Sequence, residues 1–159
     1  MKKVVIAILG TNKTRTRWVT KLPTPKQRKA NLSLQNPLPI YDMDIECVDL
    51  CIAMNRLPGI ETSESCCGHS RRSFLVFFRV TNHKKRGFRT LARLMCNRYH
   101  NFANKGWRIQ LYHGDHPKNQ VMYLLVGPKN GADQANELAK RINNHVDNKV
   151  NYYNILYNK

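Results

Sequence analysis

A cluster of chemically reactive side chains lies near the middle of the chain, in the segment Thr62–His69. It contains two adjacent thiols, Cys66 and Cys67, the imidazole of His69, a glycine and several hydroxyls. An apolar segment precedes it, and the most hydrophobic run of the chain, Phe74–Phe78, follows it. Functional groups are often placed on loops that rigid elements hold, so this segment is predicted to carry the site.

One interpretation of the cluster is a zinc site. Cys47 and Cys51 are four residues apart in a predicted helix and therefore share a face. Together with Cys66, Cys67 and His69 they would complete a tetrahedral shell. However, the usual two-residue gap between paired thiolates is absent, and the helical cysteines also fit an apolar stripe. Zinc therefore remains an alternative, and no resident cofactor is expected.

Covalent catalysis is a second interpretation. Either Cys66 or Cys67 would act as the nucleophile, with His69, His113 or His116 as the base that activates it. No protease or phosphatase signature surrounds these residues. No catalytic residue is therefore assigned.

Binding of a phosphate-bearing ligand is the interpretation that the residues favour. Hydroxyls and accessible backbone N–H groups would line a pocket, and the two arginines that follow suit bidentate phosphate contacts. The predicted ligand-binding residues are Thr62, Ser63, Ser65, Cys66, Gly68, His69, Arg71 and Arg72. A second anion candidate is the turn at 127–131, which leads into a helix N-terminus where free N–H groups favour phosphate.

The charge of the chain makes a polyanion the expected partner. Lys and Arg number 27 against 10 Asp and Glu, which gives a net charge of +17. RNA, DNA or a smaller phosphate-bearing ligand would balance that charge. The predicted nucleic-acid or anion surface comprises Lys84, Lys85, Arg86, Arg89, Arg93, Lys129 and Asn130. Arg86, Arg89, Arg93 and Arg98 would form one patch beside the cluster together with Lys84, Lys85, Arg71 and Arg72, the alternative being a solvated helix face.

The remaining composition indicates a single domain in a reducing compartment. Five cysteines are an odd number without the spacing of a small secreted scaffold, so free thiols and a cytoplasmic location are expected. No run approaches the length of a membrane span, and the first apolar run, Val4–Leu9, is too short for a signal peptide. The oligomeric state does not follow from the sequence.

Hydrophobic periodicity predicts the elements that position the cluster. Val4–Leu9 reads as a buried strand, and the basic, proline-punctuated segment that follows reads as an arm or long loop. A helix is expected from Asp42 or Asp44 to Arg56. Strands are then expected over 60–65, 73–80, 107–112 and 121–126, helices over 88–104 and 132–146, and an edge strand over 150–157.

These elements repeat a helix–strand–strand order. The pattern predicts an α+β fold, with about three helices packed on a mostly antiparallel sheet and a basic N-terminal arm. One domain of 159 residues is expected, with a strand in residues 1–10, the arm in 11–41 and the body in 42–159.

The pattern Pro58-Gly59-Ile60-x-Thr62-x-x-Ser65-Cys66-x-Gly68-His69 resembles two groups of proteins. One is a set of small phage and bacterial proteins with an S-C-x-G-H motif after a helix. The other is the family of wybutosine-synthesising tRNA methyltransferases, whose signature is Thr-x-Ser-Ser-Cys-x-Gly followed by Arg. Ser65, Cys66 and Gly68 match that signature, whereas His69 replaces its arginine and Glu64 one of its serines.

The two resemblances imply different functions. Similarity to the phage group implies a small binding protein in the host cytoplasm that counters host defence by sequestering a nucleotide or blocking a nuclease. Similarity to the methyltransferases implies S-adenosylmethionine as a cofactor and tRNA as a substrate. The residues favour the binding protein, with the RNA methyltransferase as the first alternative. A protein that masks an acidic host protein with its charge is the second alternative.

Overall fold

The fold is described from a computed structural model that covers residues 2–6, 15–19, 21–82, 84–99, 101–112 and 121–157. For residues 2–6, 15–19 and 149–157 only the backbone is described. The expected bases His113 and His116 lie outside the described residues.

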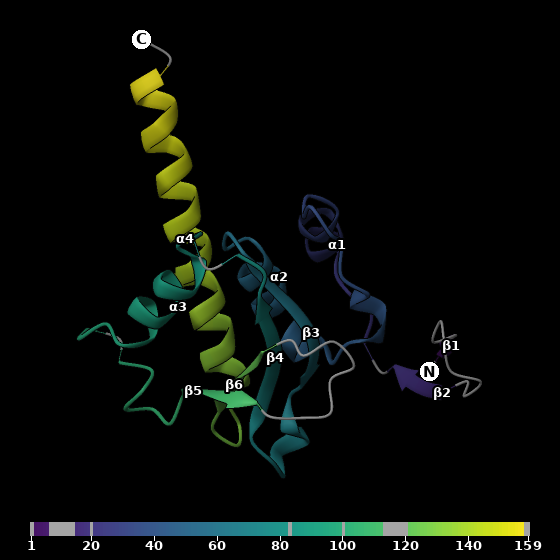
Figure 1. Ribbon diagram of the computed structural model, residues 1–159. Coiled ribbons are helices and arrows are strands. Elements are labelled where there is room, and N and C mark those ends of the chain that lie inside the picture. The colour runs from purple at the N-terminus through teal and green to yellow at the C-terminus, as the bar shows by residue number, and fades with distance from the viewer. Residues whose placement is uncertain are drawn as a thin grey trace.

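Two helices follow a short N-terminal pair of strands, and then two pairs of strands are separated and followed by single helices (Figure 1). They are, in chain order, β1 (Lys2–Ile6), β2 (Arg15–Val19), α1 (Pro25–Leu32), α2 (Ile45–Asn55), β3 (Ile60–Cys66), β4 (Phe74–Val80), α3 (Gly87–Met95), β5 (Arg108–Tyr112), β6 (Met122–Gly127) and α4 (Ala132–Tyr157). A short 3₁₀ turn lies at Ile40–Asp42, and a tight turn with non-helical backbone angles lies at Gly68–Ser70.

The body is an antiparallel sheet with strand order β3-β4-β6-β5, and α2 and α4 pack on it. β1 and β2 form a separate two-stranded antiparallel sheet. The described residues thus form an α+β fold with four helices, and the predicted fold class is confirmed. The two helix–strand–strand units are α2-β3-β4 and α3-β5-β6.

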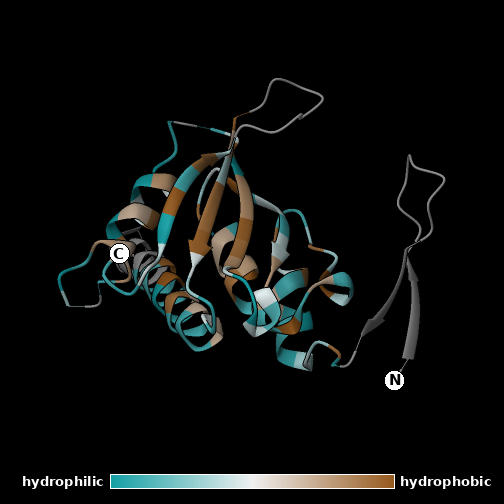
Figure 2. Cartoon of the chain, turned by 90° about the horizontal axis from the view of Figure 1, so that it is seen from below, coloured by the Kyte–Doolittle hydropathy of each residue, from teal (hydrophilic) through white to brown (hydrophobic). Residues whose placement is uncertain are grey.

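The core lies between the sheet and the helices, where the hydrophobic residues gather (Figure 2). Phe74, Val76 and Phe78 alternate along β4 and are fully buried, because this strand has a neighbour on both sides and helices on one face. They share one apolar cluster with Leu50 of α2 and Leu138 of α4. Two packed helices and a central strand therefore hold the loop between β3 and β4 in place.

The expected arm contains a helix that the sequence did not reveal. α1 has no apolar stripe, and its start is fixed by a capping box in which Thr24 and Gln27 bond each other's backbone N–H groups. The buried amide of Asn31 then bonds both the N–H and the C=O of Leu38. Polar capping rather than hydrophobic periodicity orders this segment, so a search for apolar stripes misses it.

Two further element predictions were wrong. The helix expected to reach residue 104 ends at Met95, because Asn97 accepts the N–H of Tyr99 and so competes with the helical bonds. The expected edge strand over 150–157 is the last part of α4. Continuing a formed helix adds one hydrogen bond per residue without needing a partner strand.

No helix in the described ranges has the length and hydropathy that crossing a membrane would require.

Candidate functional site

The loop after β3 turns through three consecutive residues with positive φ. Gly68 has φ +74°, His69 +48° and Ser70 +58°. At Gly68 a Cβ atom would lie 2.7 Å from the backbone oxygen of Ser73, so only glycine fits. The carbonyl of Gly68 accepts the N–H groups of Arg71 and Arg72, which closes the turn. A left-handed conformation is unfavourable for non-glycine residues and therefore marks this loop as a constrained feature.

His69 lies between a carboxylate and a thiol. Its Nε2 atom is 3.6 Å from Oδ2 of Asp44, and its Nδ1 atom is 3.5 Å from Sγ of Cys67. Asp44 precedes the first residue of α2, and its carboxylate also accepts the backbone N–H of Cys67 at 3.0 Å. The side chain of Asp44 is only 6% exposed, whereas that of His69 is 64% exposed. The loop is therefore fastened to the start of α2 and presents one imidazole to solvent.

The predicted ligand-binding residues do not all meet at this loop. Cys66 and His69 come together, and their donor atoms lie within 4.8 Å of each other and of Asp44. Ser65 faces inward toward the thiols of Cys47 and Cys51. Exposed Ser63 lies where the register of β3 shifts. Exposed Arg71 and Arg72 follow the turn, and Thr62 is bound to Asn55 of α2 through its hydroxyl and its N–H.

Three thiols near the loop, those of Cys47, Cys51 and Cys67, are poorly suited to nucleophilic catalysis. Burial, which has the largest effect, and the nearby carboxylates of Asp44 and Glu46 together raise the pKa of Cys67 to about 11, although a hydrogen bond with the backbone of His69 lowers it. Burial likewise raises the pKa of Cys51 to about 12 and that of Cys47 still higher. A nucleophilic cysteine needs the opposite shift, because the thiolate is the reactive form.

Alkylation at pH 8 is expected to modify Cys67 roughly 10–50-fold more slowly in the folded protein than in urea. A pKa raised to about 11 reduces the thiolate fraction at pH 8, and the greater nucleophilicity of a more basic thiolate offsets only part of that loss. The rate should therefore rise as the pH is raised toward 11. Iodoacetamide labelling followed by peptide mass spectrometry measures it, with exposed Cys96 as the internal control. Faster labelling in the folded state would instead indicate an activated thiol.

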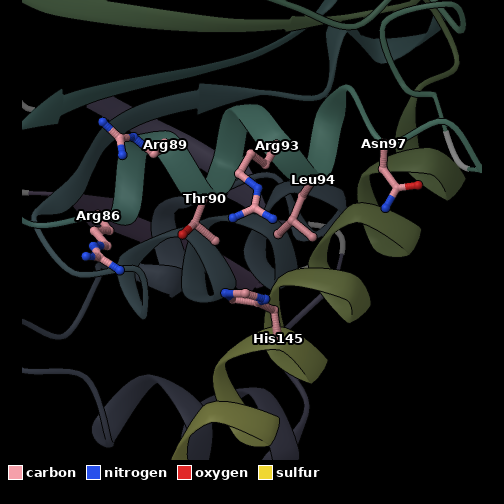
Figure 3. A pocket seen from close by; sticks show the side chains of 7 residues that line it. All are labelled: Arg86, Arg89, Thr90, Arg93, Leu94, Asn97 and His145. Carbon is pink, nitrogen blue, oxygen red and sulfur yellow. The ribbon is translucent and has the colours of Figure 1, made fainter.

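A second site lies between α3 and α4, and it gathers most of the predicted basic surface. It is a pocket of about 470 Å³ (Figure 3). Its lining residues are Arg86, Arg89, Thr90, Arg93, Leu94, Asn97 and His145. Figure 3 shows Thr90, Arg93 and Leu94 projecting from α3 toward His145 of α4, with Arg86 and Arg89 near the start of α3. We call this hollow the arginine pocket.

In the described part of the chain, the arginines of this pocket have no carboxylate within ion-pair distance. α3 itself contains no Asp or Glu. Among the described residues, no carboxylate forms an ion pair with Arg86, Arg89 or Arg93. By contrast, Arg56, Arg79 and Arg141 are each paired with a carboxylate. The three guanidinium groups of the pocket are therefore available to an external anion.

The expectation of one basic patch beside the cluster was wrong. The start of α3 packs closely against Pro58. A Cβ atom on Gly87 would lie only 2.4 Å from the backbone oxygen of Pro58. Pro58 adjoins the end of the sheet where β3 starts, whereas Arg71 and Arg72 lie at the end where β3 finishes. Strands of this length separate the two ends by about 20 Å.

The other predicted basic residues divide between these two ends of the sheet. Exposed Lys84 lies in the turn before α3, and Lys85 lines a separate hollow with Arg56. Exposed Lys129 and Asn130 lie at the end of the sheet where β3 finishes and β4 begins. Their turn is held there because the oxygen of Pro128 accepts the N–H of Phe74, the first residue of β4. The 127–131 turn therefore does not contribute to the arginine pocket.

Several residues of the two sites were missed in the sequence. Thr90 and Asn97 are spaced three or four residues from Arg86 and Arg93, so the helix predicted over 88–104 could have placed them on the same face. Asp44 looked like an ordinary helix cap, and His145 comes from a helix far along the chain. No local signal predicts that the fold brings these last two residues to the sites.

Comparison with known proteins gave no match to a family model, to a curated protein or to a solved structure. The likenesses noted in the sequence therefore remain similarities of a short motif, and the function has to be argued from the residues themselves.

Proposed function

We propose that this protein binds a phosphate-bearing ligand in the arginine pocket, with RNA favoured over a free nucleotide. The observation that carries the proposal is that Arg86, Arg89 and Arg93 all line one pocket and form no ion pair with a carboxylate among the described residues. Guanidinium groups bind phosphate oxygens through two parallel hydrogen bonds, which is the strongest arrangement available to side chains.

The other lining residues supply neutral hydrogen-bonding groups. The hydroxyl of Thr90 and the amide of Asn97 can donate to phosphate or sugar oxygens, and Leu94 provides the apolar part of the lining. The volume of about 470 Å³ lies within the range of small-ligand pockets. The only ring in the lining is the imidazole of His145, whereas three lining residues are arginines, which favours recognition of the phosphate backbone.

The charge of the whole chain favours a polyanion over a single nucleotide. Three arginines would already balance one nucleotide, whereas the net charge of the chain is +17. A positive charge of this size attracts RNA at long range and increases the rate of association. The polymer is therefore the better electrostatic match.

Arg93→Ala is expected to weaken the binding of a single-stranded RNA oligonucleotide about tenfold, which corresponds to one lost charge-assisted hydrogen-bonded contact. Fluorescence anisotropy at several salt concentrations measures the affinity. With three phosphate contacts, the logarithm of the association constant should fall with the logarithm of the salt concentration with a slope of about −2. Loss of one contact should make this slope less negative by about 0.7.

Arg98→Ala is the matched control, because it removes the same charge just beyond α3. The guanidinium of Arg98 lies 4.7 Å from the ring centre of Tyr99 and is not part of the pocket lining. Equal losses in the two variants would contradict a defined phosphate site. If a free nucleotide bound with the same affinity as the RNA, the ligand would be the nucleotide rather than the polymer. Binding of S-adenosylmethionine instead would support the methyltransferase.

A further inference from the structure

We infer that Asp44, Cys66 and His69 form a binding site for one divalent zinc-class metal ion. The three residues come from the start of α2, the end of β3 and the turn that follows it. One carboxylate oxygen, one sulfur and one ring nitrogen all lie within 4.8 Å of one another. This inference does not depend on the arginine pocket, which lines a different part of the molecule.

The spacing of the donor atoms is close to that of a tetrahedral zinc shell. Zinc bonds of 2.0–2.3 Å at tetrahedral angles place neighbouring ligand atoms roughly 3.5 Å apart. Nε2 of His69 is already 3.6 Å from Oδ2 of Asp44. Since no pair exceeds 4.8 Å, the sulfur of Cys66 is at most roughly 1.3 Å farther from either of the other donors than this spacing requires.

The atoms around these donors have the roles that are typical of a second shell. The N–H of Gly68 lies 3.4 Å from Sγ of Cys66 and donates to it, which stabilises a thiolate. Sγ of Cys67 lies 3.5 Å from Nδ1 of His69 and can accept a hydrogen bond from the N–H at Nδ1 when Nε2 binds the metal. The N–H of Cys67 donates to Oδ2 of Asp44 and fixes that carboxylate.

The charge and chemical type of the ligands favour zinc. When the metal binds, Cys66 loses its thiol proton to solvent and becomes a thiolate. One thiolate, one carboxylate and a neutral imidazole then balance the two charges of the cation. A mixed sulfur, nitrogen and oxygen set suits a borderline cation better than magnesium or calcium, which prefer oxygen ligands.

Three protein ligands leave the fourth position of the metal open. Asp44 forms the buried side of the site and His69 the solvent side, with exposed fractions of 6% and 64%. Zinc sites with three protein ligands and an accessible fourth position bind water or substrate there, whereas purely structural sites use four protein ligands. The structure therefore assigns this metal an accessible position rather than a closed structural shell.

Metal titration of the full chain, prepared without metal, tests the inference. We expect one equivalent of Zn²⁺ to compete with a chromophoric chelator, and Co²⁺ to produce a sulfur-to-metal charge-transfer band. Asp44→Asn, Cys66→Ser and His69→Asn should each weaken zinc binding 100-fold or more. Asparagine is chosen at position 69 because it tolerates a left-handed backbone, so the turn is retained.

Two further cysteine variants separate ligand from neighbour. Cys96→Ser, at an exposed thiol just after α3, should bind zinc like the wild type. Cys67→Ser should keep the cobalt band and weaken binding about tenfold, as expected for a second-shell partner. Unchanged zinc affinity in Cys66→Ser, or a cobalt complex without the charge-transfer band, would overturn the inference. RNA binding measured with chelator present should be unaffected, which distinguishes this test from that of the arginine pocket.

Discussion

The double variant Arg86→Glu/Arg89→Glu is expected to bind single-stranded RNA at least 100-fold more weakly than the wild type. Each arginine lost removes a charge-assisted phosphate contact worth about 1.5–3 kcal/mol. Each glutamate adds a negative charge at the mouth of the same pocket and repels the phosphate. Anisotropy titration at one fixed salt concentration measures the change, because RNA affinities can be compared only at equal salt.

The fold should tolerate this double variant. Arg86 is the N-cap residue of α3 and Arg89 lies in its first turn. Negative side chains at these positions interact favourably with the helix dipole by about 0.3–1 kcal/mol each. A weaker binding constant can therefore be attributed to the pocket, and an unchanged thermal midpoint would support that attribution.

The matched control is Lys26→Glu/Arg28→Glu in α1. It changes the net charge by the same amount, and both residues are exposed on a helix that does not line the arginine pocket. We expect its affinity to fall less than tenfold, since only long-range attraction is reduced. If both double variants lost the same RNA affinity, the net charge of the chain rather than the arginine pocket would be responsible for binding. That result is expected for a protein that masks an acidic partner.

The body of the fold could be predicted because its elements have strong periodic patterns. β4 is apolar on both faces, which is typical of a strand that is largely covered on both faces, and α2 ends at Asn55, shortly before the Pro58-Gly59 pair. The segments without such a pattern were missed. α1 depends on a capping box, and the early end of α3 depends on the side chain of Asn97. In both places local polar hydrogen bonds decide the structure.

The sites could be predicted only in part, because each depends on contacts between distant segments. Cys66 and His69 stand out in the sequence, but Asp44 lies 23 positions before its partner Cys67. Likewise, α3 carries a visible run of arginines, but the pocket exists only because α4 crosses it and contributes His145. Residue types thus indicated where chemistry could occur, and tertiary packing decided which residues meet.

Trp107→Ala is expected to lower the free energy of unfolding by about 3–5 kcal/mol, the usual cost of removing a large buried aromatic side chain. Trp107 is 1% exposed, and its ring centre lies 5.5 Å from that of Phe74. The ring also fills the space where Gly127 has no side chain, since a Cβ atom there would lie 2.8 Å from it. Its indole N–H donates to Gln134 of α4 at 2.8 Å.

This side chain joins three parts of the fold, so its loss should affect the whole body. It precedes β5, contacts β4 and β6, and bonds α4, which together surround the core. A domain of this size has a total stability of about 5–15 kcal/mol, so the variant should have a sharply reduced urea midpoint. Far-UV circular dichroism measures that midpoint without relying on the fluorescence of the replaced residue.

Two variants at or near the same position separate packing from hydrogen bonding. Trp107→Phe keeps a ring against Phe74 but loses the bond to Gln134, and is expected to cost about 1–2 kcal/mol. Leu111→Ala removes an apolar side chain from β5 that is 53% exposed, and should cost less than about 1 kcal/mol. If Trp107→Ala unfolded at the same urea concentration as Leu111→Ala, the buried contacts of Trp107 would not be what holds the sheet to α4.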